Sequence, residues 1–260
     1  FASSGTGTSA MDTAVSNLVG PGTRVLSLVG GYFADRIAQM CQRYGGVVTR
    51  LDYEWGRAVD PEAVRRALAA SAADVVTVVH AETSTGVLNP VEAIAAIAKE
   101  HGALSIVDAV TSLGGHPLDM GGWGLGAVYS CAQKCIGAPS GIAPVAFAPE
   151  ALSRRVENPV FYFDVSLLED YWLRRKYHHT ICASLVYALR EALMMVEEEG
   201  LEQRWARHRT HHEVLAAGLE AMGLSLLPPA GERLWTLNAV RVPEGVDELA
   251  VRKAMLSRFD

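Results

Sequence analysis

Short apolar runs alternate with amphipathic stretches over the first 150 or so residues of the chain. Runs such as 74–80 and 104–108 lack polar alternation, which is typical of strands covered on both faces. We predict strands at 23–29, 47–51, 74–80, 104–108, 126–131 and 143–148, and helices at 35–45, 61–70 and 90–102. This alternation predicts an α/β fold with a mostly parallel central sheet and helices on both of its faces.

The pattern changes to long helices after about residue 150. Residues 183–223 form the longest periodic stretch, and Gly200 is expected to separate two helices within it. A strand over 236–243 and a helix over 246–259 are predicted to begin a smaller α+β unit. We therefore expect a large α/β domain over residues 1–180, and linking helices with the start of a small C-terminal domain over residues 181–260. The opening Phe1 and the stop just after a helical pattern suggest a fragment cut at both ends.

Composition and charge narrow the class of function. The 260 residues are 50% hydrophobic and 20% charged, as in ordinary globular proteins. A net charge of -6 argues against a surface for nucleic acid or anionic membranes. Neither a membrane span nor a leader is visible, and the four cysteines lack the spacing of a disulfide framework or a zinc site. We expect a soluble, cytoplasmic protein with small-molecule ligands.

The glycine-rich stretch SSGTGTSAMDTAVSNLV near the start is predicted to be a turn that leads into a helix. Its backbone amides and the helix N-terminus would bind a phosphate group, and Thr6 and Thr8 add hydroxyls. Gly5, Gly7 and Ala10 also match the dinucleotide fingerprint G-x-G-x-x-A. That fingerprint needs a preceding strand and an acidic residue about 20 positions later, and the sequence shows neither. We therefore favour phosphate binding over nicotinamide or flavin binding.

Three polar residues follow or end predicted strands: Thr83, Asp108 and Lys134. The carboxyl ends of parallel strands share one edge of a sheet, where α/β proteins bind their ligands. A lysine buried in the apolar stretch YSCAQKCIGAPSG would favour its neutral, nucleophilic form. Two simpler interpretations stay open: a solvated or capping Asp108, and a Lys134 whose head reaches water.

A phosphate-binding turn, a carboxylate and a lysine on one edge are the groups that pyridoxal phosphate requires. The motifs SGTGT, HAETSTGVLNP, VDAVTSLGG, QKCIGAPSG, YFDVSLLEDYW and YHHT follow in an order that resembles the class-V, fold-type I aminotransferases. The chain is most similar to their alanine-glyoxylate and serine-glyoxylate group, and is close to the ureidoglycine-glyoxylate group. This resemblance covers nearly the whole chain. It implies a pyridoxal phosphate-dependent homodimer that transfers an amino group from alanine or serine to glyoxylate or a similar 2-oxo acid.

The resemblance also implies a role for each matching residue. Lys134 would form the Schiff base with the cofactor, and Asp108 would keep the pyridine nitrogen protonated. The other implied contacts are Thr6, Gly7, Thr8 and Gln133 around the phosphate, Phe33 and Val110 on the ring faces, and Thr83 near the ring oxygen. Tyr177 and Thr180 would reach the cofactor phosphate of the partner subunit. The family's arginine for the substrate carboxylate is expected beyond Asp260.

Three alternatives compete with this interpretation. A cysteine desulfurase of the same fold would have histidines where this chain has Phe33 and Gln133. A non-catalytic cofactor sensor would usually carry a DNA-binding module, and none is visible. The ureidoglycine branch shares QKCIGAPSG, but it has asparagine where this chain has Tyr177.

His208, His211 and His212 have a helical spacing that can bind a metal ion. The metalloprotease pattern H-E-x-x-H is missing and arginines flank the histidines, so we expect a solvated helix face and no metal site.

Overall fold

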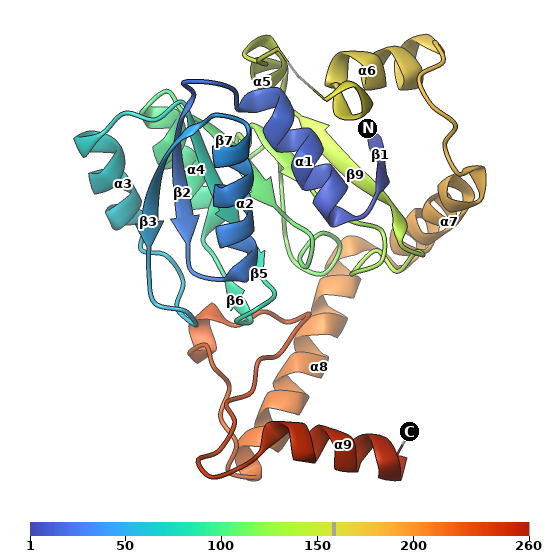
Figure 1. The fold of residues 1–260 in the computed structure, drawn as a ribbon. Coiled ribbons are helices and arrows are strands. Elements are labelled where there is room, and N and C mark those ends of the chain that lie inside the picture. The colour runs from blue at the N-terminus through green and yellow to red at the C-terminus, as the bar shows by residue number, and fades with distance from the viewer. Residues whose placement is uncertain (158–159, 260) are drawn as a thin grey trace.

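A computed structural model describes residues 1–157 and 160–259. Its centre is a seven-stranded sheet with the order β1-β9-β8-β7-β4-β2-β3 (Figure 1). The strands are β1 (Ala2–Gly5), β2 (Arg24–Val29), β3 (Val47–Asp52), β4 (Val75–Val79), β7 (Leu104–Asp108), β8 (Ala127–Tyr129) and β9 (Gly141–Phe147). The pairs from β3 to β8 are parallel, whereas β9 pairs antiparallel with both β8 and β1. The predicted mostly parallel sheet is therefore confirmed.

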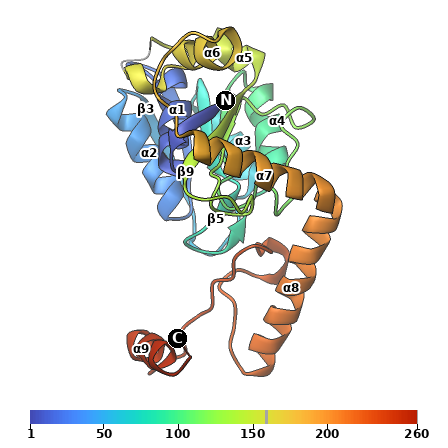
Figure 2. The same ribbon diagram turned by 90° about the vertical axis from the view of Figure 1, so that its right-hand side faces the viewer.

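Helices cover both faces of this sheet (Figures 1 and 2). On one face lie α1 (Gly7–Leu18) and α2 (Tyr32–Arg43), and on the other lie α3 (Pro61–Ala70) and α4 (Val91–Glu100). Strand β2 illustrates the two cores: Val25 and Val29 pack with α1 and α2, while Leu26 and Leu28 pack with α3 and α4. Burial on both faces explains why the parallel strands read as uninterrupted apolar runs.

The later part of the chain is helical, with α5 (Pro149–Ser153), α6 (Val165–Arg174), α7 (Ala183–Glu199), α8 (Leu201–Ala221) and α9 (Glu248–Phe259). Leu189 and Ala192 of α7 pack with Ile142 of β9. Gly200, with φ +81°, separates α7 from α8 as predicted. Helix α8 leads away from the sheet, and the exposed α9 lies apart from it, about level with its far end (Figure 2). Among the described residues, no helix is both long and apolar enough to cross a bilayer.

Two expectations about elements are wrong. Residues 236–243 do not form a strand, because their described pairing is a single antiparallel bridge between Leu226 and Val240. The alternating sequence TLNAVRVP is suitable for a strand, but a strand also needs a neighbour along its length. Conversely, a strand does precede the glycine-rich turn: β1 lies at the sheet edge against β9. The division into domains at residue 180 stays a prediction.

Candidate active site

The turn between β1 and α1 is packed tightly against the loop that follows β7. Gly5 has φ +127°, in the region that favours glycine. Gly7 is buried, and a Cβ atom there would lie 2.9 Å from the side chain of Val110. Thr6 and Thr8 are exposed, and the Thr6 side chain does not cap α1. The first amides of α1 therefore face a turn that can bind an anion such as phosphate.

This turn is not the dinucleotide site that its glycine spacing also matches. A Rossmann turn joins a parallel strand to its helix within a βαβ unit. Here β1 pairs antiparallel with β9 at the edge of the sheet. The preference for phosphate binding over a nicotinamide or flavin fingerprint therefore has a topological reason.

Asp108 is a buried carboxylate at the carboxyl end of β7, with only 2% of its surface exposed. The Val110 amide donates a hydrogen bond to Oδ1 over 2.8 Å, and the Tyr129 hydroxyl donates to Oδ2 over 2.9 Å. Burial raises the pKa of Asp108 to about 7, and these two donors act in the opposite direction. The negative charge of Glu82 adds to the rise. A nearby cationic partner would therefore stabilise the ionised carboxylate strongly.

Thr83 comes from a neighbouring loop to the same edge of the sheet. It follows the short strand β5 (Ala81–Glu82), which pairs with β6 (Val87–Leu88). Its hydroxyl lies 2.5 Å from the hydroxyl of Thr111, in the loop after Asp108. The His80 amide also donates to the Asp108 carbonyl over 2.9 Å, which joins the ends of β4 and β7. Thr83 and Asp108 are thus brought together, as the strand ends predicted.

Lys134 lies in a turn over residues 132–136, beyond the end of β8. The Gly137 amide closes this turn on the Lys134 carbonyl over 3.0 Å, and the Cys135 thiol donates to the Thr111 carbonyl over 3.3 Å. Lys134 and Gln133 are both exposed, which corrects the expectation of a buried lysine. The reason is that β8 ends at Tyr129, so the apolar sequence around Lys134 belongs to a turn at the rim of the sheet.

Phe33 is the second residue of α2 and is half-buried. Its ring makes an edge-to-face contact with Tyr32, with the centroids 5.4 Å apart. The guanidinium carbon of Arg36 lies 5.1 Å from the ring centroids of Tyr32 and of Phe33. Nη1 of Arg36 donates a hydrogen bond to the Thr8 hydroxyl over 3.1 Å. Arg36 therefore places a cation beside the turn between β1 and α1, and this residue was not identified from the sequence. The sequence did contain a signal for Arg36, because a residue three positions after Phe33 lies on the same face of a helix.

Tyr177 and Thr180 lie apart from this group, in the segment between α6 and α7. Tyr177 is 79% exposed, and its hydroxyl is 3.2 Å from that of Thr180. The segment is held to β1 by His179, whose Nε2 lies 2.8 Å from the Ser4 hydroxyl. The structure therefore places both residues on the outer surface of the chain.

The loop after Asp108 also contacts the segment that follows α8. The Thr236 hydroxyl donates to the Thr111 carbonyl over 2.7 Å, and this carbonyl also accepts from Cys135. The Trp235 amide donates to Nε2 of His116 over 2.8 Å, and the two rings stack with centroids 4.2 Å apart. These contacts join the candidate site to the C-terminal part of the chain.

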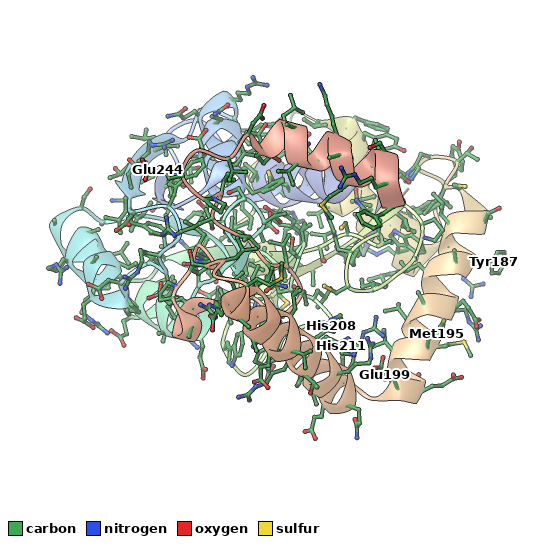
Figure 3. The ribbon with its side chains drawn as sticks, turned by 90° about the horizontal axis from the view of Figure 1, so that it is seen from below. Tyr187, Met195, Glu199, His208, His211 and Glu244 are labelled. Carbon is green, nitrogen blue, oxygen red and sulfur yellow. The ribbon has the colours of Figure 1, made fainter. Side chains whose placement is uncertain are left out.

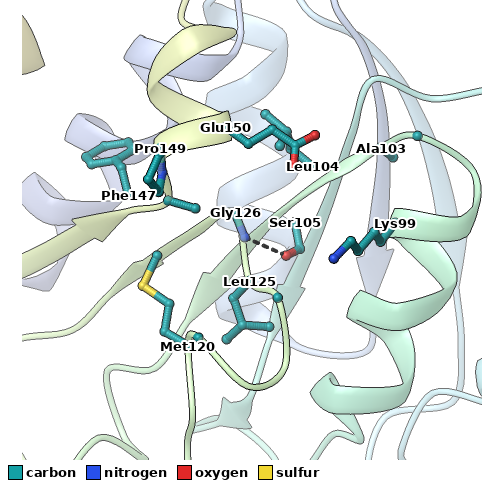
Figure 4. A pocket seen from close by; sticks show the side chains of 14 residues that line it. Lys99, Ala103, Leu104, Ser105, Met120, Leu125, Gly126, Phe147, Pro149 and Glu150 are labelled. Atoms are coloured by element: carbon teal, nitrogen blue, oxygen red, sulfur yellow. Dashed lines mark hydrogen bonds between the residues drawn. The ribbon is translucent and has the colours of Figure 1, made fainter.

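A separate cavity of about 520 Å³ lies at the opposite edge of the sheet (Figure 4). It is lined by the beginnings of β7 and β8, where the Gly126 amide donates to the Ser105 hydroxyl over 3.1 Å. Its charged side chains are Lys99 and Glu150. Parallel sheets usually bind their ligands at the carboxyl ends of strands, and neither Asp108 nor Lys134 lines this cavity.

The histidines of α8 do not form the uniformly solvated face that the sequence suggests. His211 is exposed and His208 is half-buried (Figure 3). His212 is buried, and its Nδ1 lies 2.6 Å from Oδ1 of Asn238. The difference arises because residues 234–238 fold back against this helix. Within residues 1–157 and 160–259, no cluster of side chains is suited to holding a metal ion.

Comparisons with known proteins agree with this arrangement. A profile of the family "Aminotransferase class-V" matches residues 1–254. The (S)-ureidoglycine–glyoxylate transaminase of Bacillus subtilis is 35% identical over 98% of this chain and 67% of its own length. The alanine–glyoxylate aminotransferase of Drosophila melanogaster is 35% identical over 96% of this chain and 67% of its own. The crystal structure of an alanine–glyoxylate aminotransferase from Nostoc sp. is 42% identical, with a TM-score of 0.96, over 100% of this chain and 70% of that one.

The fold and the residues at the carboxyl edge of the sheet define a fold-type I enzyme that uses pyridoxal phosphate. The chain belongs to the class-V aminotransferase family. Its residues fit the cofactor: an anion-binding turn, a buried carboxylate for a cationic ring nitrogen and a lysine converge on the loop after β7.

Proposed function

We propose that this enzyme transfers the amino group of a small amino acid, alanine or serine, to glyoxylate or a similar 2-oxo acid. Asp108 carries the proposal, because a buried carboxylate at the end of β7 suits a protonated pyridine nitrogen. The alanine–glyoxylate aminotransferases among the similar proteins support the choice of substrates.

When bound, pyridoxal phosphate supplies an electron-withdrawing ring that stabilises negative charge at the amino acid Cα. Lys134 would hold the cofactor covalently through Nζ and then move the Cα proton as a general base and acid. Asp108 would keep the proton on the ring nitrogen. We assign the remaining contacts as phosphate binding by Thr6, Gly7, Thr8 and Gln133, ring contacts by Phe33 and Val110, and a hydroxyl contact by Thr83.

A donor screen tests the proposed reaction. With glyoxylate as acceptor, we expect the enzyme loaded with pyridoxal phosphate to form glycine from L-alanine or L-serine, together with pyruvate or hydroxypyruvate. Both products should be measured by chromatography. Sulfide release from L-cysteine without glycine formation would contradict transamination and favour a desulfurase.

The second candidate is (S)-ureidoglycine–glyoxylate exchange. The Bacillus subtilis relative favours it, as does the motif QKCIGAPSG. Tyr177 argues against it, since that branch has asparagine at this position. Turnover with (S)-ureidoglycine in the same screen, with alanine and serine inactive, would reverse the assignment.

We also propose that the active sites are shared between the two subunits of a cytoplasmic homodimer. Tyr177 and Thr180 are on the outer surface, available to a second copy of the chain. Large apolar side chains are exposed on the parts of the chain that flank this segment: Phe161 and Leu173 before it, and Tyr187, Leu193 and Met195 on α7 after it. Figure 3 labels Tyr187 and Met195. Apolar and aromatic side chains at this density favour a buried interface. The cysteines are free thiols, which supports a reducing compartment.

Subunit mixing tests the shared site. We expect Lys134→Ala protein and Tyr177→Phe/Thr180→Ala protein each to be impaired alone. Random exchange puts both lesions into one site of each hybrid and leaves the other site intact. About one quarter of wild-type activity should then return, since half of the dimers are hybrids with one good site. Exchanged subunits without recovered activity, or an active monomer in sedimentation, would contradict the shared site.

A further inference from the structure

The N-terminus of α2 has no capping side chain of its own. Its N-cap residue is Gly31, and the amides of Tyr32, Phe33 and Ala34 belong to the first helical turn. Such amides have no acceptor within the helix and must be satisfied from outside it. The one that matters most for the proposed site is Phe33, since its backbone sets where the ring lies.

A loop about 50 residues further along the chain supplies the missing acceptors. The Ser84 hydroxyl accepts from the Tyr32 amide over 2.9 Å. The Glu82 carboxylate accepts from the Phe33 amide over 3.4 Å through Oε1 and from the Ala34 amide over 3.1 Å through Oε2. Three consecutive amides are therefore capped by two side chains of one loop.

Glu82 is buried, with 2% of its surface exposed, and its other contacts hold it in place. Its Oε1 also accepts from the Ser84 amide over 3.1 Å and from the Ser84 hydroxyl over 2.6 Å. A Cβ atom at Gly31 would lie 2.3 Å from Cγ of Glu82, so the glycine leaves the space that the carboxylate fills. A carboxylate at a helix N-terminus is favoured by the dipole and by the free amides.

The same loop carries Thr83 between the two capping residues. Its hydroxyl bonds to that of Thr111, in the loop after Asp108. One rigid connection therefore fixes Phe33 and Thr83 relative to each other and to Asp108. We propose that Glu82 is a positioning residue, which caps α2 from the β5 loop and so sets Phe33 and Thr83 against the cofactor ring. This inference rests on the proposed roles of Phe33 and Thr83.

Glu82→Gln tests the proposal with little change in shape. The one carbonyl oxygen of the glutamine amide can accept either from the groups that donate to Oε1 in the wild type or from the Ala34 amide. The NH2 group then points at the remaining donors, which lose their acceptor. In the protein loaded with pyridoxal phosphate, we expect exchange of the amides of residues 32–34 to speed up roughly five- to tenfold, as for a lost cap. The dissociation constant of pyridoxal phosphate should rise by a similar factor, and the visible circular dichroism per bound cofactor should fall.

Asp60→Asn is the matched control, because Asp60 caps α3 by accepting from the Glu62 amide over 3.0 Å, away from the site. Because one amide oxygen is enough to accept from Glu62, Asp60→Asn should keep this cap and change neither the affinity for pyridoxal phosphate nor the cofactor's ellipticity. If Glu82→Gln does not fold, Ser84→Ala removes the acceptor for Tyr32 and should show the same changes more weakly. Wild-type cofactor affinity and ellipticity in both Glu82→Gln and Ser84→Ala would overturn the positioning role. Absence of cofactor binding by the wild-type protein would instead overturn the proposed function.

Discussion

Replacing Lys134 by alanine should abolish covalent attachment of pyridoxal phosphate and all measurable transamination. No other side chain of the turn after β8 has an amine, so the variant cannot form the bond to the cofactor. Because Lys134 is exposed, its removal should leave the packing of the fold unchanged. Borohydride reduction followed by mass spectrometry should find the cofactor on Lys134 in the wild type and on no residue of the variant.

Lys99→Ala is the control for this experiment. Lys99 is also exposed, but it lines the cavity at the opposite edge of the sheet (Figure 4). Its removal should change neither the attachment nor the rate. A retained covalent adduct in Lys134→Ala, with another of Lys99, Lys176 or Lys253 modified, would refute the assignment of Lys134.

Asp108→Asn should leave the cofactor bound but reduce turnover by roughly a hundredfold or more, which corresponds to about 3 kcal/mol of barrier. An amide cannot keep the pyridine nitrogen protonated by ionic pairing. The substitution fits the site, because the amide oxygen can accept from Val110 and the NH2 group can donate to the Tyr129 oxygen. Single-turnover rates should be compared with Asp74→Asn, which alters a carboxylate paired with Arg24 at the protein surface. Near wild-type rates in Asp108→Asn would make Asp108 a purely structural residue.

The same substitution should change how stability depends on pH in the protein without cofactor. The pKa of Asp108 is 3.8 in the unfolded chain and about 7 in the folded one. Between these values the folded state binds the extra proton, so the wild type loses stability as pH rises from about 4 to 7. The full effect is about 4 kcal/mol, and Asp108→Asn should not show it. Urea unfolding at pH 4 and pH 8 measures this effect. The free energy of unfolding of Asp108→Asn should rise relative to that of the wild type between pH 4 and pH 8. The same difference between the two proteins at both pH values would contradict the raised pKa.

The sequence was sufficient to predict most elements of the sheet and its helices. Helix α3 was predicted at its observed bounds, where Pro61 occupies the first turn and Asp60 caps it. The strand predicted over residues 236–243 is wrong, because alternation of apolar and polar residues does not supply a partner strand. Strand β1 was not predicted, because its short sequence has no strand pattern of its own. Its partner strand β9 lies more than 130 positions away in the chain.

The candidate site was predictable where it follows from strand ends, and less so where it depends on register. Thr83 and Asp108 converge because parallel strands end at one edge. The Tyr129 hydroxyl reaches Asp108 because the two residues are directly paired across β7 and β8, which no local pattern reveals. The Glu82 cap likewise depends on tertiary packing. The exposure of Lys134 could not be inferred from apolar neighbours, because small residues also form turns.

The Thr111 carbonyl accepts hydrogen bonds from both Cys135 and Thr236, so two distant parts of the chain share one acceptor. Cys135 follows Lys134 directly, and its own carbonyl accepts from Nη2 of Arg204 on α8 over 2.5 Å. The lysine turn, the loop after Asp108 and the C-terminal segment therefore form one energetic unit in which the effects of separate substitutions do not add. A rotation of α8 and the segment beyond it would pull on the peptide next to Lys134, which gives the C-terminal part of the chain a direct mechanical connection to the turn that carries this lysine.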